Sequence, residues 1–340
     1  MKIAVIAKTR LPIAEPFRGG LEAFTHSLCT EYLRLGHEMT LYAHLESDSN
    51  LHLKGFYDND HRESAHFEIY ENDEYLSILK DIELNNFDVV HNNSTNELPI
   101  LWGAKASIPV VTTVHTPPIS KLKAATSICS GSQNLHFVFP SQLFRKSWEP
   151  FINTSSQIIH NGVDLDQWPL IRENGEYLFW FGRMVHSKGL DIVIDAAHEL
   201  NMPFRFAGPI DDKLYFEEHI IPRLTDHDTY LGHLKQGEIH QQMKGAAAVV
   251  SAVRWEEPFG LTNIEAMASG VPLAGFDRGA FSELVNVESG VVAEQKNVKS
   301  LVKAIEAAIL LESNKVRQHA EKFSLKTMAQ HYINLFEEII

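Results

Sequence analysis

Two glutamates, Glu257 and Glu265, lie within the stretch WEEPFGLTNIEAMASGVP at residues 255–272. Each oxygen of a carboxylate can accept one hydroxyl proton, so such groups suit the vicinal hydroxyls of a ribose or a hexose. A helix that begins near Leu261 or Thr262 would offer unpaired backbone N–H groups to an anion. We expect Glu257 in the loop before this helix and Glu265 on its first turn. The alternative is that each glutamate only complements the helix dipole.

Two cations stand close together in FGRMVHSKG, residues 181–189. Arg183 follows an apolar run that reads as a buried strand, and Lys188 is expected to open the next helix. Both side chains can reach one diphosphate across the turn. Positive charge at that place would stabilise a departing phosphate if a bond to the diphosphate were broken. Taken singly, an Arg or Lys in a loop is more often a solvated residue than a ligand contact.

Three further positions are candidates for a binding site. The pair Gly19-Gly20 precedes a helical pattern and would leave room for a ligand at the start of the helix, although a glycine pair is usually only a turn. It is not GxGxxG, and no such fingerprint occurs elsewhere, which argues against a nicotinamide-dependent dehydrogenase. His115 ends the run VVTTVH and is a candidate base or a satisfied strand-end histidine. Asn161, in HNGVD, either lines a site or forms a turn.

Alternating strands and helices must position these residues. Short β-rich runs alternate with amphipathic segments, which predicts α/β architecture with parallel sheets covered by helices on both faces. The pattern starts afresh after Asn161-Gly162, so we expect two doubly wound domains that face one another across a cleft. The expected strands are 2–7, 39–44, 88–91, 110–115 and 135–140, then 177–182, 204–208, 248–253 and 272–276; the expected helices include 21–35, 190–200, 298–311 and 325–340.

Composition excludes several classes of protein. The 340 residues carry a net charge of −14, which disfavours nucleic acid and strongly anionic lipid as partners. Cys29 and Cys129 make neither a metal motif nor a disulfide framework, so a reducing, cytoplasmic location is expected. No signal peptide and no stretch of eighteen apolar residues is found, which predicts a soluble protein without a transmembrane segment. Peripheral membrane contact stays open.

The stretch 255–272, with its continuation to Glu283, closely resembles the signature of the retaining GT-B glycosyltransferases of family 4, and the resemblance covers essentially the whole chain. It implies two Rossmann-like domains: an acceptor domain at 1–162 and a nucleotide-sugar donor domain at 163–324. Residues 325–340 would form a helix that crosses back to the first domain.

The resemblance also assigns roles to the candidate residues. Glu257 would contact the transferred sugar and Glu265 the ribose hydroxyls. Arg183 and Lys188 would bind the diphosphate. The diphosphate would also meet the backbone amides of Phe259, Gly260, Leu261 and Thr262. Gly19 and Gly20 would close over the donor phosphate. His115 would lie next to the transferred sugar, and Asn161 would line the donor site.

A metal site is not expected. Asp58-Asn59-Asp60 spells the DxD pattern with which another glycosyltransferase fold holds Mn²⁺ or Mg²⁺, but it lies in a polar stretch that reads as a solvated loop. The resembled family is metal-independent, with Arg183 and Lys188 supplying the positive charge. We therefore expect no cofactor and no required metal.

The activity implied is transfer of a hexosyl group to an acceptor hydroxyl with retention of configuration. The departing phosphate oxygen would help to deprotonate the acceptor on the same face. A UDP-sugar is favoured as donor over a GDP-sugar, and the acceptor is left open among small molecules, glycans and lipid-linked sugars, as is a homodimer. The rivals are a GT-B nucleotide-sugar epimerase and a non-catalytic nucleotide-sugar-binding protein.

Overall fold

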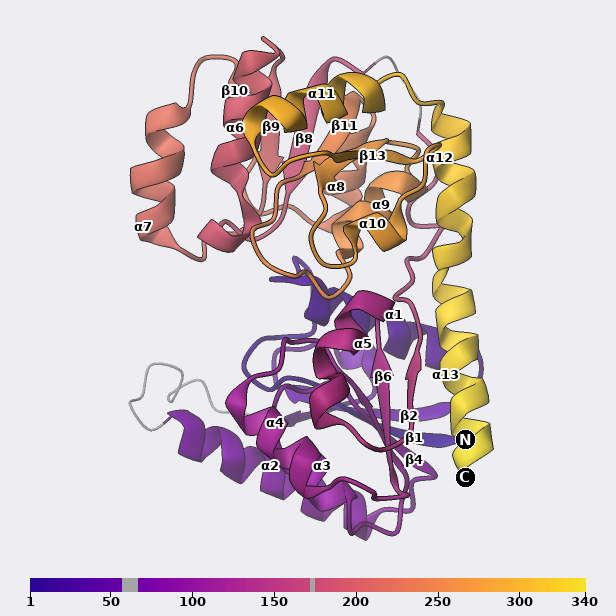
Figure 1. Ribbon diagram of the computed structural model, residues 1–340. Coiled ribbons are helices and arrows are strands. Elements are labelled where there is room, and N and C mark those ends of the chain that lie inside the picture. Colours follow the sequence, from indigo (N-terminus) through magenta and orange to yellow (C-terminus); the bar gives the residue numbers. More distant parts are fainter. Residues whose placement is uncertain (57–66, 172–174) are drawn as a thin grey trace. The chain divides into compact units, whose positions relative to one another are not determined.

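The computed structural model describes residues 1–56, 67–171 and 175–340 (Figure 1). By its internal contacts the chain divides into two units. The first unit comprises Met1–Phe17, Leu21–His160 and Leu325–Ile340; the second comprises Arg18–Gly20 and Asn161–Ser324. The division therefore falls next to the turn at which the sequence pattern starts afresh, and the last helix groups with the first unit.

The first unit is built on a seven-stranded parallel sheet. Its strand order is β3-β2-β1-β4-β5-β6-β7, which reverses direction beside β1 as in a doubly wound fold. The strands are β1 Lys2–Ile6, β2 Glu38–His44, β3 Leu53–Phe56, β4 Val89–Asn92, β5 Val110–Thr113, β6 Leu135–Phe139 and β7 Ser156–Ile158. The helices are α1 Gly20–Arg34, α2 Phe67–Leu84, α3 Leu98–Gly103, α4 Ser120–Ile128, α5 Gln142–Trp148 and α13 Leu325–Ile339.

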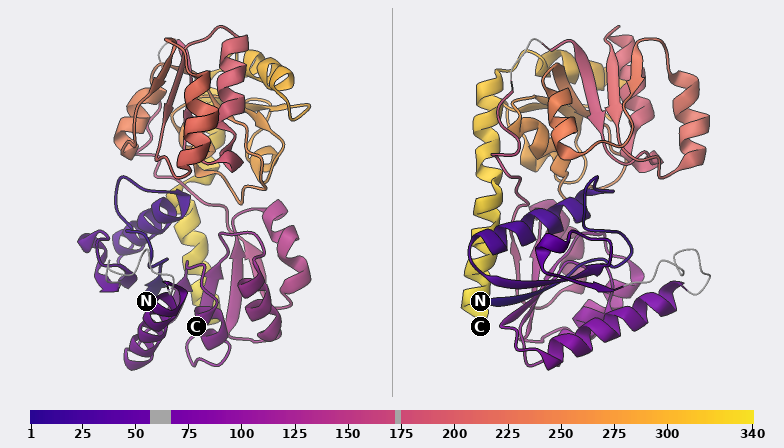
Figure 2. Two further views of the ribbon diagram at one scale, coloured as in Figure 1. Left: turned by 90° about the vertical axis from the view of Figure 1, so that its left-hand side faces the viewer. Right: turned by 180° about the vertical axis from the view of Figure 1, so that it is seen from behind.

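Helix α13 lies beside the sheet of the first unit (Figure 2). Its contacts there include aromatic and polar side chains. The hydroxyl of Tyr332 lies 2.8 Å from Thr113 Oγ1, which is also 2.8 Å from His91 Nε2. Phe336 closes the same buried cluster, 5.5 Å from the ring of His91 between centroids. Burial lowers the pKa of His91 to about 3, so this histidine is neutral and serves the packing of α13.

The second unit has a six-stranded parallel sheet in the order β10-β9-β8-β11-β12-β13. Strand β8, Tyr177–Phe181, lies inside this sheet and shows why both faces must be covered. Leu178 and Trp180 lie in one apolar core, and Phe179 and Phe181 lie in the other. The strands are β8 Tyr177–Phe181, β9 Phe204–Ala207, β10 Asp228–Tyr230, β11 Ala246–Ser251, β12 Leu273–Phe276 and β13 Gly290–Ala293.

Helices cover the two faces of this second sheet. Helices α6 Leu190–Glu199 and α11 Val298–Ala308 supply one core. Helices α8 Gln236–Met243, α9 Leu261–Ala268, α10 Phe281–Leu284 and α12 Ser313–Ala320 supply the other. The short α7 is Lys213–Tyr215. Within the described residues, no helix is long and apolar enough to cross a membrane.

Candidate active site

The loop before α9 delivers backbone amides to the carboxyl end of the second sheet. Gly260 has a φ of +91°, and a Cβ there would come within 2.6 Å of Asn263 Nδ2, so glycine is required at this position. Helix α9 begins at Leu261, as expected, and its N-cap residue, Gly260, has no side chain that could cap the helix. The amides of Leu261 and Thr262 consequently stand at the positive end of the helix dipole.

Glu257 lies in this loop, as predicted, and is held by a cation and an indole. Its Oε2 accepts hydrogen bonds from Lys188 Nζ at 2.5 Å and from Trp255 Nε1 at 2.8 Å. Lys188 also lies 5.5 Å from the centroid of the Trp255 ring. The structure thus brings together Lys188 and Glu257, two candidates that are 69 positions apart in the chain.

The expected position of Lys188 was wrong in detail. Lys188 does not open a helix but ends a 3₁₀ turn, His186–Lys188, and α6 begins only at Leu190. Gly189 separates the two in a left-handed conformation, which allows the chain to turn sharply from one to the other. The side chain of Lys188 is therefore carried by the loop after β8.

Arg183 follows β8 as predicted, but its partner was not foreseen. Its Nη1 lies 3.5 Å from Asp211 Oδ2, and its side chain is 43% exposed. The ion pair with Asp211 leaves the Arg183 side chain partly exposed, so it can still address an added anion.

Glu265 lies on α9, but on its second turn: it is the fifth residue of a helix that begins at Leu261, not a first-turn residue as expected. Its side chain is buried, and burial raises its pKa to about 7, an effect that a hydrogen bond from Gln236 Nε2 at 3.4 Å offsets only in part. A half-protonated carboxyl at neutral pH is a perturbed group of the kind that gathers at functional sites.

His115 belongs to the first unit and lies beyond the end of its strand, because β5 stops at Thr113 rather than at His115 as expected. Its Nε2 is 3.1 Å from Asn93 Oδ1, and its ring meets Phe24 edge-on at 4.8 Å between centroids. Burial lowers the pKa of His115 to about 3, so the imidazole is neutral at physiological pH.

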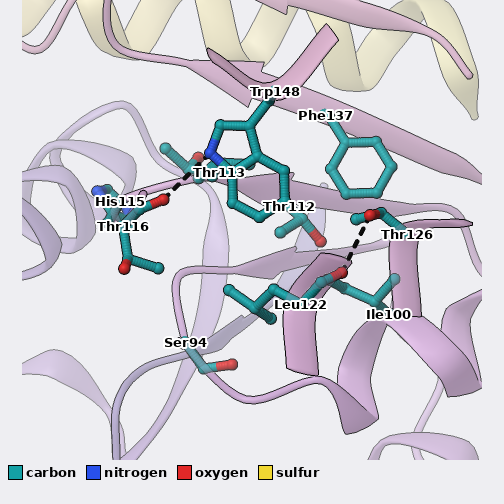
Figure 3. Close-up of a pocket in the computed structure, with 11 residues that line it drawn as sticks. Ser94, Ile100, Thr112, Thr113, His115, Thr116, Leu122, Thr126, Phe137 and Trp148 are labelled. Carbon is teal, nitrogen blue, oxygen red and sulfur yellow. Dashed lines mark hydrogen bonds between the residues drawn. The ribbon is translucent and has the colours of Figure 1, made fainter. Parts of the chain in front are cut away.

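A small pocket inside the first unit lies beside His115 (Figure 3). Trp148 spans it and donates its indole N–H to the carbonyl of Thr116 at 3.1 Å. The rest of its wall is formed by hydroxyl-bearing and apolar side chains, among them Ser94, Thr112 and Leu122. No other residue that we singled out from the sequence lines this pocket.

The remaining candidates lie at the junctions of elements. Gly20 is the first residue of α1 and Gly19 directly precedes it, so the glycine pair lies at the start of a helix. Asn161 is the first residue of the second unit after His160 and is buried. Its Oδ1 has no hydrogen-bond partner among the described residues. A buried amide oxygen without a partner is unusual in a folded protein.

The expectation about metal can be examined only in part, because Asp58 and Asp60 lie outside the described residues. Within residues 1–56, 67–171 and 175–340 there is no group of three or more His, Cys, Asp and Glu side chains that could hold a metal ion. Cys29 and Cys129 are free and buried.

A cation, a helix N-terminus and two carboxyls at the carboxyl edge of a parallel sheet can bind an anion attached to a polyol. With two doubly wound α/β units, this arrangement defines a glycosyltransferase of the GT-B fold. Two family models match successive parts of the chain: Glycosyltransferase Family 4 over residues 18–167 and Glycosyl transferases group 1 over residues 164–326. The chain belongs to family 4 of the GT-B glycosyltransferases, and it is an enzyme of that class.

Similar proteins agree with this assignment. An uncharacterised glycosyltransferase of Methanocaldococcus jannaschii is 24% identical over 76% of this chain and 77% of its own. The lipopolysaccharide core mannosyltransferase LpsB of Rhizobium meliloti is 23% identical over 71% of this chain and 80% of its own. The sucrose-phosphate synthase of Thermosynechococcus elongatus has the same fold, with a TM-score of 0.82 at 14% identity, over 100% of this chain and 99% of its own. HepE of Anabaena, solved with UDP-glucose, gives a TM-score of 0.77 at 17% identity over 99% and 100%.

Trp255, Asp211 and Gln236 are the site neighbours that sequence reasoning missed. Trp255 stands two positions before Glu257, so an indole donor next to a loop carboxylate was a readable signal. Asp211 comes from the loop after β9 and Gln236 is the first residue of α8, and nothing local to either indicates which residue it meets.

Proposed function

We propose that this enzyme is a retaining glycosyltransferase that moves a hexosyl group from a nucleotide diphosphate sugar, preferably a UDP-sugar, to an acceptor hydroxyl without a required metal. The observation that carries the proposal is the contact of Lys188 with Glu257 in the same unit as the amino-terminal end of α9. The ammonium group of Lys188 suits a phosphate, and the carboxylate of Glu257 suits a sugar hydroxyl.

Each part of the donor has a suitable partner. The pyrophosphate is addressed by Arg183, Lys188 and the amides at the start of α9, and the ribose hydroxyls by Glu265. Glu257 accepts hydroxyl protons of the hexosyl group, which requires Lys188 to share or leave its carboxylate when the donor binds. His115 is neutral and supplies a hydrogen bond to the transferred sugar rather than a charge. Asn161, Gly19 and Gly20 complete the donor contacts.

The chemistry follows from this charge distribution. As the glycosyl–phosphate bond breaks, negative charge develops on the departing phosphate oxygen, where Arg183 and Lys188 stabilise it. That oxygen accepts the proton of the acceptor hydroxyl, which attacks from the same face, so the anomeric configuration is retained. These two fixed cations supply the charge that a divalent ion supplies in other transferases.

A UDP-sugar is favoured because HepE, whose fold this chain shares, was solved with UDP-glucose. The mannosyltransferase LpsB supports a hexosyl group as the transferred unit, and a GDP-sugar is the second choice of donor. The acceptors considered are small molecules, glycans and lipid-linked sugars.

The test is a thermal-shift screen with UDP-glucose, UDP-galactose, UDP-N-acetylglucosamine and GDP-mannose, because a ligand that binds the native state raises Tm. The stabilising donor is then incubated with acceptors, with and without EDTA, and the product anomer is read by NMR. Transfer with a retained anomer in EDTA supports the proposal. An inverted product, EDTA-sensitive transfer, epimerisation of the donor, or binding without turnover each contradicts it.

A further inference from the structure

We propose that Arg254 and Trp255 are positioning residues that hold Lys188 against Glu257 before the donor arrives. This inference rests on the proposed function, because it explains how the Lys188–Glu257 pair is set up. The two residues follow β11, next to each other in the chain, and neither was assigned a role from the sequence. Arg254 holds the backbone that carries Lys188, and Trp255 holds the two charged side-chain ends.

Arg254 bonds to two successive carbonyls of the turn that carries Lys188. Its backbone N–H donates to the carbonyl of Ser187 at 2.8 Å. Its Nη1 donates to the carbonyl of His186 at 2.9 Å. The turn is thus fixed at two consecutive peptide groups just before Lys188, and both bonds come from one residue.

A buried carboxylate fixes Arg254 in turn. Asp191, on the first turn of α6, accepts hydrogen bonds from both terminal nitrogens of Arg254, at 2.8 and 2.6 Å. Tyr215 donates its hydroxyl to the same carboxylate at 2.6 Å. Burial alone would raise the pKa of Asp191, but the hydrogen bonds from Arg254 and Tyr215 bring it to about 2. The guanidinium therefore always has a charged, bidentate partner.

The turn also lies directly on the end of β11, with no side chain between them. A Cβ on Gly189 would come within 2.0 Å of the Ala252 carbonyl oxygen, so only glycine fits where the two backbones meet. This contact and the bonds from Arg254 leave the backbone before and after Lys188 little freedom.

Trp255 acts on the side chains. Its indole N–H donates to the same oxygen of Glu257 that Lys188 contacts, and its ring faces the ammonium group at 5.5 Å. One indole therefore orients the carboxylate through its edge and attracts the cation through its face. Preformed geometry of this kind lowers the ordering cost that binding or catalysis would otherwise meet.

The first variant is Arg254→Lys, which keeps the positive charge but cannot bond bidentately to Asp191 and reach His186 as well. Its matched control is Arg223→Lys. Arg223 also pairs with an aspartate of α6, Asp195, and donates to a backbone carbonyl, that of His219. Arg223 does not make the two hydrogen bonds by which Arg254 holds the carbonyls of His186 and Ser187.

The second variant is Trp255→Phe, which keeps a ring but removes the indole N–H. Its matched control is Trp102→Phe, because Trp102 donates its indole N–H to Glu83 in the first unit. This pair keeps the proposal testable if Arg254→Lys fails to fold, which circular dichroism and Tm measurements show.

The first readout needs no substrate. The folded proteins are treated with a limiting amount of acetic anhydride, and acetylation of Lys188 is compared with that of the exposed Lys303 by peptide mass spectrometry. We expect Lys188 to react severalfold faster in both variants than in the wild type and the controls. Unchanged Lys188 acetylation in both variants overturns the proposal.

The second readout is kinetic. With the donor found in the screen, we expect kcat to fall about 10- to 100-fold in Arg254→Lys, as small misplacements in active sites do, and KM to change less. In a Lys188→Ala background the same substitution should add almost nothing, because Arg254 acts through Lys188. An undiminished loss of kcat in that background overturns the proposal. Faster acetylation of Lys188 in an enzyme that transfers no sugar supports the positioning role and refutes the proposed function instead.

Discussion

Glu265 makes the stability of this protein depend on pH in a defined direction. Its carboxyl is buried on α9, and burial raises its pKa from the ordinary 4.5 to about 7. We consider Glu265→Gln, which keeps the volume and the hydrogen-bonding capacity but cannot ionise. At pH 8 the wild type must hold a buried carboxylate, which costs the native state about 3 kcal/mol relative to the unfolded chain.

The sign follows from proton binding. Between pH 4.5 and 7 the native state binds more protons at Glu265 than the unfolded state does. The contribution of Glu265 to stability is therefore full below pH 4.5 and is lost as the pH rises through 7. The Gln variant has no such loss, so its advantage over the wild type should grow by about 2 to 3 kcal/mol from pH 5 to pH 8.

Urea unfolding of both proteins at pH 5, 6, 7 and 8 measures this difference, and the subtraction removes every other titrating group. Glu306→Gln, on the exposed side of α11, serves as the control for loss of one surface charge. A gap between the Gln variant and the wild type that is the same at pH 5 and pH 8 would refute the reasoning. It would mean that Glu265 is solvated enough to ionise normally.

Two other predictions concern single contacts. Gly260→Ala should lower the free energy of unfolding in urea by about 1 to 2 kcal/mol or more, because an alanine would be held at positive φ against Asn263. The control is Gly237→Ala, where a Cβ meets open space, and it should not destabilise the protein. Equal effects of the two substitutions would refute this prediction. Tyr332→Phe should cost about 1 kcal/mol by removing the hydroxyl that Thr113 meets. An unchanged unfolding free energy for Tyr332→Phe would show that this hydroxyl does not help to hold α13.

The interior strands were predictable from the sequence and the edge strands were not. Every run that we expected to be a strand overlaps one, because strands buried on both faces must be continuously apolar. The four strands that were missed, β3, β7, β10 and β13, are the edges of the two sheets. They are three or four residues long and only partly buried, so too few apolar residues mark them.

In the candidate site, too, the features with a local sequence signal were predictable and those set by long-range contacts were not. The loop before α9 follows from Gly260 and the helix pattern, which are local signals. The partner of Lys188 depends on how two loops after different strands meet, and no local pattern encodes that distance. The raised pKa of Glu265 likewise depends on what covers its side chain, and no local pattern in the sequence encodes that burial.

The role of Lys188 is the central claim, and steady-state kinetics of Lys188→Ala test it most directly. With the donor identified by the screen, we expect kcat to fall about 10²- to 10³-fold, since a positioned charge on the leaving group is lost. KM for the donor should change much less, and Lys303→Ala, which removes an exposed lysine on α11, should behave as the wild type. A Lys188→Ala enzyme with wild-type kcat would contradict the account.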